Sequence, residues 1–258
     1  MIKLTRVASS VVNAPKLFVL SGGPGLSSLT MRGLDLLNRS FEIIYVDFQG
    51  TNDSSYLGKK SFVEQVSLLS EAIKNESGLK YILGHSFGGF FASDIFLQGG
   101  VAGLVCISTP FSRASLTAAN DNYETHKTPA LAEAELDWSQ NQDDASFAKW
   151  LSEYGVLYFK NLEGRTILLN DKVSSAFFRD NRTDVLDKEV MLESLEKKNG
   201  IKVFICGKDD KLLPPNILKN DAHLGKFDFY EIEHASHFVT VDQPEEVARL
   251  IETKLLRS

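Results

Sequence analysis

The sequence predicts a doubly wound α/β protein, in which a mostly parallel sheet carries helices on both faces and a helical cap insertion. Short runs rich in Val, Ile, Leu and aromatic residues alternate with longer helical patterns along the 258 residues. These runs are continuously apolar, as is typical of parallel strands that are covered on both faces. One connection, after residue 108, is far longer than a single crossover helix requires. This rhythm of elements predicts the fold class.

Six apolar runs are the expected strands. In chain order they cover residues 16–21, 42–47, 80–84, 103–108, 202–207 and 227–233. Helices are expected between them, over residues 62–73, 87–97 and 244–256. Pro244 and the two glutamates after it suit a first helical turn, because proline lacks an N–H and carboxylates favour the positive end of a helix.

The long connection predicts a cap domain. Between residues 108 and 202 the chain is mostly helix-forming, and only residues 165–170 form a strand-like run. We expect residues 111–186 to form a helical cap, with residues 1–110 and 187–258 as the α/β core. An apolar stripe at helical spacing is expected to belong to the interior of the cap rather than to contact a substrate. Its members are Phe147, Trp150, Leu151, Tyr154 and Tyr158.

Composition excludes several classes of partner. The formal net charge of −6 disfavours binding to nucleic acid and to anionic membranes. No segment has the length of a membrane span or the pattern of a signal peptide. Cys106 and Cys206 lie in apolar runs and are expected to be reduced core thiols. We therefore expect a cytoplasmic protein that requires no metal and no organic cofactor.

The strongest motif is Gly84-His85-Ser86-Phe87-Gly88-Gly89, which follows one predicted strand and precedes a predicted helix. A sharp turn at this place exposes a serine hydroxyl at the sheet edge, and the helix N-terminus favours negative charge beside it. Gly84 and Gly88 fit such a turn because the neighbouring backbone comes close. Ser86 is the predicted nucleophile. The alternative is a glycine-rich turn without chemistry.

A nucleophilic serine needs a histidine as its base and a carboxylate that orients the histidine. In this strand–turn–helix arrangement the chain order is serine, acid, histidine. Asp210 follows a late strand and is the predicted acid, with Asp209 as the alternative. His237 is the predicted base in the loop after the last strand, in preference to His234, which is still tied to the direction of that strand. The remaining histidines, His85, His126 and His223, are expected to have no catalytic role.

Acyl transfer also requires N–H donors for the oxyanion. The backbone N–H of Phe87 is one expected donor, and the second is expected from the loop at residues 21–25, after the first predicted strand. This loop has the sequence Ser-Gly-Gly-Pro-Gly, which lacks the Lys-Ser/Thr ending of a phosphate-binding loop and the spacing of a dinucleotide motif.

With these motifs the sequence resembles the α/β-hydrolase superfamily over essentially its whole length, and within it the proline iminopeptidase family. Residues 21–25 are similar to the family's H-G-G-P-G, and residues 47–54 to its D-Q-R-G-x-G-x-S. Asp210 lies in a G-x-x-D-x-x-x-P context, and His237 in a matching short loop. The resemblance implies release of an N-terminal residue, often proline, from small peptides, with Gly23 and Phe87 as oxyanion donors. It further implies cap carboxylates that hold the free amine. The candidates are Glu124, Glu133, Glu135 and Asp137.

The sequence also departs from that family. Ser21 replaces the usual His, Phe48-Gln49 replaces Gln-Arg, and the G-H-S-F-G spelling around Ser86 is common among esterases. The alternative function is therefore hydrolysis of a carboxylic ester or lactone in a small-molecule substrate. A non-catalytic scaffold is a third class, and the presence of Ser86, Asp210 and His237 at matching places argues against it.

Overall fold

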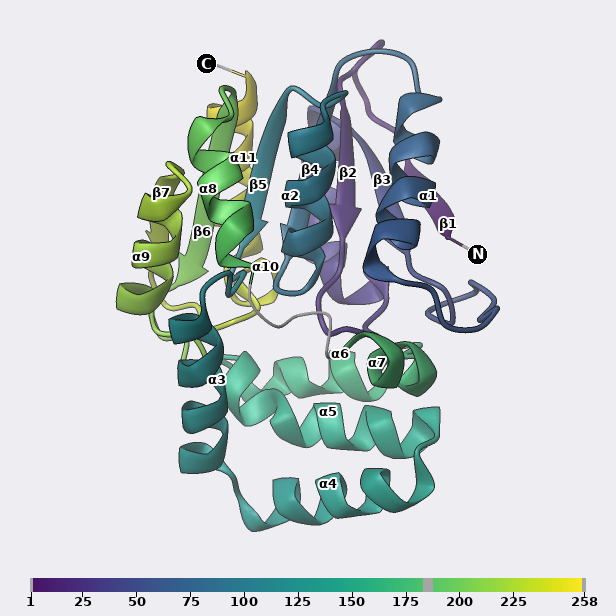
Figure 1. Cartoon of the computed structure of the whole chain (residues 1–258), viewed down its shortest axis with the longest axis vertical. Coiled ribbons are helices and arrows are strands. Elements are labelled where there is room, and N and C mark those ends of the chain that lie inside the picture. The colour runs from purple at the N-terminus through teal and green to yellow at the C-terminus, as the bar shows by residue number, and fades with distance from the viewer. Residues whose placement is uncertain (1, 183–187, 257–258) are drawn as a thin grey trace.

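A seven-stranded sheet forms the centre of the computed structural model, which describes residues 2–182 and 188–256 (Figure 1). The strand order is β1-β3-β2-β4-β5-β6-β7. Strand β1 is antiparallel to β3, and the other neighbours are parallel. The strands are β1 (Lys3–Val7), β2 (Lys16–Leu20), β3 (Glu42–Asp47), β4 (Lys80–His85), β5 (Gly103–Ile107), β6 (Ile201–Gly207) and β7 (Asp228–Ile232).

Successive side chains of the strands enter two separate cores, one on each face of the sheet. Phe18 and its neighbour Ile44 belong to one core, whereas Val19 and Tyr45 belong to the other. The first core is covered by α1 (Phe62–Lys74), α2 (Gly88–Gln98), α8 (Glu189–Lys197) and α9 (Pro215–Leu224). The second is covered by η1 (Ser28–Arg39), α10 (Val239–Asp242) and α11 (Pro244–Leu256). The predicted doubly wound α/β fold is confirmed.

A layer of helices lies at the carboxyl ends of the parallel strands, at the bottom of Figure 1. It contains α3 (Arg113–His126), α4 (Pro129–Asn141), α5 (Asp144–Tyr158), η2 (Leu162–Gly164), α6 (Arg165–Leu169) and α7 (Ser175–Asn181). The predicted end of the cap, at residues 186 and 187, lies outside the described residues, so the division of the chain into core and cap stays a prediction. Across residues 2–182 and 188–256, no helix has both the length and the apolar character needed to cross a bilayer.

At two places the secondary structure differs from the pattern of apolar runs in the sequence. The strand-like run at residues 165–170 forms α6, because its neighbour in the fold is the helix α5 rather than another strand. Strand β1 was not expected from the sequence. It pairs on one side only, at the edge of the sheet, so its residues are mostly half-buried and it lacks a continuous apolar run.

Both cysteines are buried in the sheet as free thiols, Cys106 in β5 and Cys206 in β6. Burial raises the pKa of the Cys106 thiol to about 12 and raises that of Cys206 as well. Because the thiolate is the reactive form, neither side chain is a nucleophile in the folded protein.

Candidate active site

Ser86 lies at a sharp turn between β4 and α2. Its backbone has a φ of 49°, in the left-handed region that non-glycine residues rarely adopt. The turn is tight, since a Cβ added to Gly84 would lie 2.3 Å from the carbonyl oxygen of Gly88. The Ser86 N–H donates to the carbonyl oxygen of Ile107 at 2.7 Å, which fixes the turn to β5. Ser86 is half-buried while His85 and Phe87 beside it are buried, so the turn presents the serine at the sheet edge.

The glycine loop, residues 21–25, lies directly against Ser86. A Cβ added to Gly22 would come within 3.2 Å of the Ser86 Cβ, so only a glycine fits there. Gly23 has a φ of 113°. Within residues 2–182 and 188–256, the backbone N–H groups of Gly23 and Phe87 have no hydrogen-bond partner. Backbone N–H groups without a protein partner can donate to a negatively charged ligand atom, and both lie beside Ser86.

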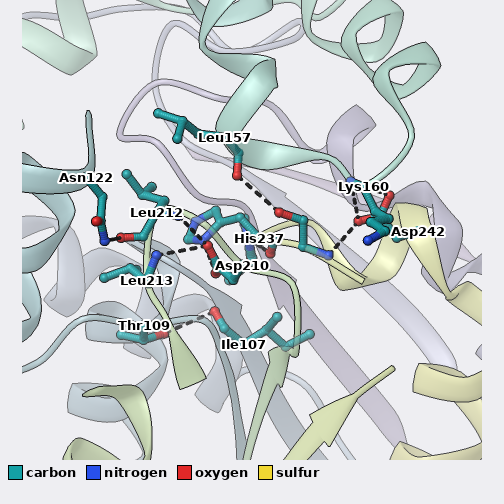
Figure 2. A network of polar contacts seen from close by, with 12 residues as sticks. Ile107, Thr109, Asn122, Leu157, Lys160, Asp210, Leu212, Leu213, His237 and Asp242 are labelled. Carbon is teal, nitrogen blue, oxygen red and sulfur yellow. Dashed lines mark hydrogen bonds and ion pairs between the residues drawn. The ribbon is translucent and has the colours of Figure 1, made fainter. Parts of the chain in front are cut away.

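His237 and Asp210 form a buried pair. The Nδ1 atom of His237 lies 2.9 Å from Asp210 Oδ2, and both side chains are almost fully buried. Figure 2 shows the Asp210 carboxylate between the imidazole and the backbone of Leu212 and Leu213. The N–H groups of those two residues donate to Asp210 Oδ1 at 2.9 Å each. The carboxylate is therefore held from both sides, and its second oxygen faces the imidazole.

The alternative acid and base lie elsewhere. Asp209 pairs with Lys160 at 3.0 Å in a half-exposed ion pair. His234 is exposed to solvent in the same loop as His237. Of the two aspartates and two histidines weighed from the sequence, the structure brings together Asp210 and His237.

His85 connects the serine turn to His237. Its Nε2 atom lies 3.1 Å from the main-chain carbonyl oxygen of His237, so a proton on Nε2 allows it to donate there. The two imidazole rings are in contact, with centroids 4.9 Å apart. Burial, and secondarily the charge of His237, hold the pKa of His85 well below its usual range. His85 is therefore neutral. This contact was missed from the sequence, because a residue next to the serine was expected to point away from the site.

Ser86 and His237 are adjacent through His85 but not directly bonded. Across the described parts of the chain, the Ser86 hydroxyl makes no hydrogen bond to the imidazole of His237. Bonds of this kind are often long or poorly aligned without substrate and become shorter in the complex.

A stack of aromatic rings runs from the cap to His237. Tyr123 and Tyr154 stack with centroids 4.9 Å apart, and Tyr154 lies 4.5 Å from Tyr158. Tyr158 in turn stacks on the imidazole of His237 at 5.1 Å with an interplanar angle of 19°. The stripe that was expected only inside the cap thus reaches the site. Its signal in the sequence was the four-residue spacing of Tyr154 and Tyr158, which places both on one face of α5.

The cap carboxylates proposed for an amine are mostly paired with lysines. Glu124 and Glu135 lie 3.5 and 2.5 Å from the ammonium of Lys127, and Asp137 lies 3.5 Å from that of Lys149. Glu133 is exposed on α4. A substrate amine would therefore have to replace a lysine at three of these four carboxylates.

Comparison with known proteins agrees with this architecture. The alpha/beta hydrolase family matches residues 17–250. A proline iminopeptidase from Heyndrickxia coagulans is 23% identical over 255 residues, which cover 90% of this chain and 88% of that protein. An esterase from Exiguobacterium antarcticum superposes with a TM-score of 0.73 at 15% identity, over 98% of this chain and 94% of that one. A proline iminopeptidase-related protein from Thermus thermophilus superposes with a TM-score of 0.73 at 21% identity, over 98% and 92%. These structural likenesses show a shared fold.

Proposed function

The chain belongs to the alpha/beta hydrolase family, and from that premise we propose that it is a serine hydrolase that acts through an acyl-enzyme. One observation carries the proposal. Beside a serine at a strained turn, the N–H groups of Gly23 and Phe87 have no partner in the part of the chain that the structure describes. The buried His237–Asp210 pair next to this turn supplies the base and the group that orients it.

In the proposed mechanism Ser86 attacks the substrate carbonyl and His237 accepts the hydroxyl proton on Nε2. Asp210 accepts a hydrogen bond from the Nδ1–H of His237 and stays ionised, which keeps the proton on Nδ1 and leaves Nε2 free as the base. The N–H groups of Gly23 and Phe87 stabilise the tetrahedral oxyanion, and the loss of one such donor typically costs about 3 kcal/mol of barrier. His237 then returns the proton to the leaving group. Water hydrolyses the acyl-enzyme by the same steps.

Two substrate classes have separate support. An aminopeptidase of the proline iminopeptidase type is the first candidate, supported by the relative from Heyndrickxia coagulans and by the likeness of residues 21–25 to that family's loop. Hydrolysis of a small carboxylic ester or lactone is the second candidate. The lysine pairs at Glu124, Glu135 and Asp137 favour it, because they occupy the carboxylates that an N-terminal ammonium would need. A cytoplasmic location stays a prediction from the sequence.

A substrate panel separates the candidates. Purified protein is assayed with proline and alanine p-nitroanilides and with p-nitrophenyl acetate and butyrate, and is labelled with a fluorophosphonate, which reacts with activated serines. Turnover of the anilides supports the aminopeptidase, and turnover of the esters alone supports the esterase. The Ser86→Ala variant is the control and is expected to lose turnover and labelling. A parent protein that is neither active nor labelled, or a Ser86→Ala variant that keeps the parent's rate, contradicts the proposed function.

A further inference from the structure

Two buried carboxylates hold the backbone directly after the glycine loop. The N–H of Ser27 donates to Asp171 Oδ2 at 2.9 Å, and the Ser27 hydroxyl donates to the other oxygen of Asp171. The next N–H, of Ser28, donates to Asp47 Oδ1 at 2.8 Å. Asp47 ends strand β3, whereas Asp171 lies between the cap helices α6 and α7. Two adjacent residues, where the glycine loop leads into η1, are thus held by the cap and by the sheet.

The segment that contains Asp171 makes further contacts with the site. We call residues 171–174 the cap clamp. The N–H of Ser174 donates to the carbonyl oxygen of Gly25 at 2.9 Å. A Cβ added to Gly25 would lie 2.6 Å from the Ser174 carbonyl oxygen, so the two backbones pack closely. The carbonyl oxygen of Lys172 accepts from the N–H of Asn52 at 2.8 Å, so the cap clamp is also bonded to the loop after β3.

We propose that Asp171 is a positioning residue for the oxyanion hole. Ionised Asp171 holds the glycine loop so that the Gly23 N–H faces the oxyanion of the tetrahedral adduct that forms on Ser86. The inference rests on the proposed function. Within the loop, the hydroxyl of Ser21 bonds the Leu26 carbonyl oxygen at 2.8 Å, but the glycines between them have little intrinsic rigidity. A contact from outside is therefore needed to define where the Gly23 N–H points. Misplacement of a reacting group by about 1 Å can cost about 100-fold in rate.

The environment of Asp171 makes its ionisation sensitive to pH. Its carboxylate is buried, and burial raises its pKa to about 6 despite the hydrogen bonds from Ser27. The charge that faces it from the sheet is Asp47, which makes a smaller contribution in the same direction as burial. The ammonium of its neighbour Lys172 instead pairs with Asp53 at 3.0 Å. Ionised Asp171 accepts both Ser27 hydrogen bonds. Once Asp171 is protonated, one of its oxygens carries a hydrogen and becomes a donor, which weakens the hydrogen bonds that hold Ser27.

The test uses Asp171→Asn, which has the same size and resembles the protonated form. At pH 8 we expect the rate of acylation, measured as kcat on the best ester or anilide or as fluorophosphonate labelling, to fall about 10-fold to 100-fold with KM little changed. The melting temperature is not expected to fall, because a buried charge is removed. The parent-to-variant rate ratio is expected to shrink towards one at pH 5, where the parent's own carboxyl is protonated. The ratio removes every effect of pH that the two proteins share.

Asp143→Asn is the matched control. Asp143 also lies in the cap and accepts a backbone N–H, from Ser146 at 2.8 Å, but it does not touch the glycine loop. Its substitution is expected to leave the rate unchanged. Ser27→Ala is the second variant and decides the question if Asp171→Asn does not fold. It removes the hydroxyl that donates to Asp171 and that also accepts the N–H of Leu29 at 3.1 Å at the start of η1. It is expected to lower the rate in the same direction by a smaller factor.

The outcomes separate the two proposals. A parent protein that is neither active nor labelled contradicts the proposed function itself. A labelled parent together with an equally fast Asp171→Asn variant at pH 8 overturns the role of Asp171. A rate ratio that stays constant between pH 5 and pH 8 overturns it as well.

Discussion

Replacing Asp210 by asparagine should reverse the tautomer of His237 while leaving the fold in place. Asp210 Oδ1 accepts two N–H donors, from Leu212 and Leu213. The amide oxygen of an asparagine must take that position, because an NH₂ group there would face two donors and leave both unpaired. The amide nitrogen then faces His237 Nδ1 and donates to it. Nδ1 becomes an acceptor, so the proton moves to Nε2, and the imidazole can no longer accept a proton from Ser86.

The magnitude follows from that geometry. A histidine in the wrong tautomer lowers kcat by about 10⁴-fold in serine hydrolases with this arrangement, which corresponds to about 5.5 kcal/mol of barrier. The three hydrogen bonds of residue 210 are kept, so the free energy of unfolding should change by less than about 1.5 kcal/mol. Rates are measured by ester or anilide turnover and by fluorophosphonate labelling, and stability by thermal and urea unfolding.

Asp209→Asn is the control for this experiment. Its side chain forms a half-exposed pair with Lys160, and such pairs contribute at most about 1 kcal/mol. The control should therefore keep the parent's rate. An Asp210→Asn protein that keeps more than a tenth of the parent's kcat, or an Asp209→Asn protein that loses as much, would refute the assignment of the acid.

Three further predictions concern stability and pH. Because Ser86 has a positive φ, Ser86→Gly should be about 1 kcal/mol more stable than Ser86→Ala in urea unfolding, with both inactive; a less stable glycine variant would contradict a strained turn. Gly84→Ala should cost about 3 kcal/mol, because its Cβ would meet the Gly88 carbonyl oxygen. Gly78→Ala, which meets nothing within 4 Å, should cost about 1 kcal/mol, and equal losses would argue against close packing at the turn. Asp171 has its pKa raised from 3.8 to about 6 by burial, so the native state binds more protons than the unfolded state between these values. Its contribution to the free energy of unfolding should therefore fall by about 3 kcal/mol as pH rises through this window. The measurement is the free energy of urea unfolding of the parent minus that of Asp171→Asn, at pH 3.5 and at pH 7.5. A difference that does not change with pH would contradict this prediction.

Much of the sheet could be predicted from the pattern of apolar runs along the sequence. Strands β2 to β6 lie inside the sheet and are covered on both faces, so their sequences are continuously apolar and easily recognised. Strand β1 has a neighbour on one side only, and its half-buried residues leave no such signal. The run at residues 165–170 has the residue types of a strand but lies among cap helices, and that environment decided its conformation.

The residues of the candidate site could be predicted where they directly follow a strand of the sheet. Ser86, Asp210 and His237 each follow a strand of the sheet, and the carboxyl ends of parallel strands meet at one edge. Contacts that depend on how the cap packs had no such guide. The stacking of Tyr158 on His237 and the bonds of Asp171 to Ser27 join residues 79 and 144 positions apart, and neither spacing carries a periodic signal.

The reactivity of the two buried thiols can be used to measure how often the sheet opens. Cys106 and Cys206 lie in β5 and β6, which pair directly, so reagents such as maleimides can reach them only when these strands separate. Their alkylation rate in native buffer therefore reports the free energy of opening the middle of the molecule, without any added probe. A reporter cysteine placed on the cap would react independently of both, which allows motion of the cap and opening of the sheet to be timed in the same sample.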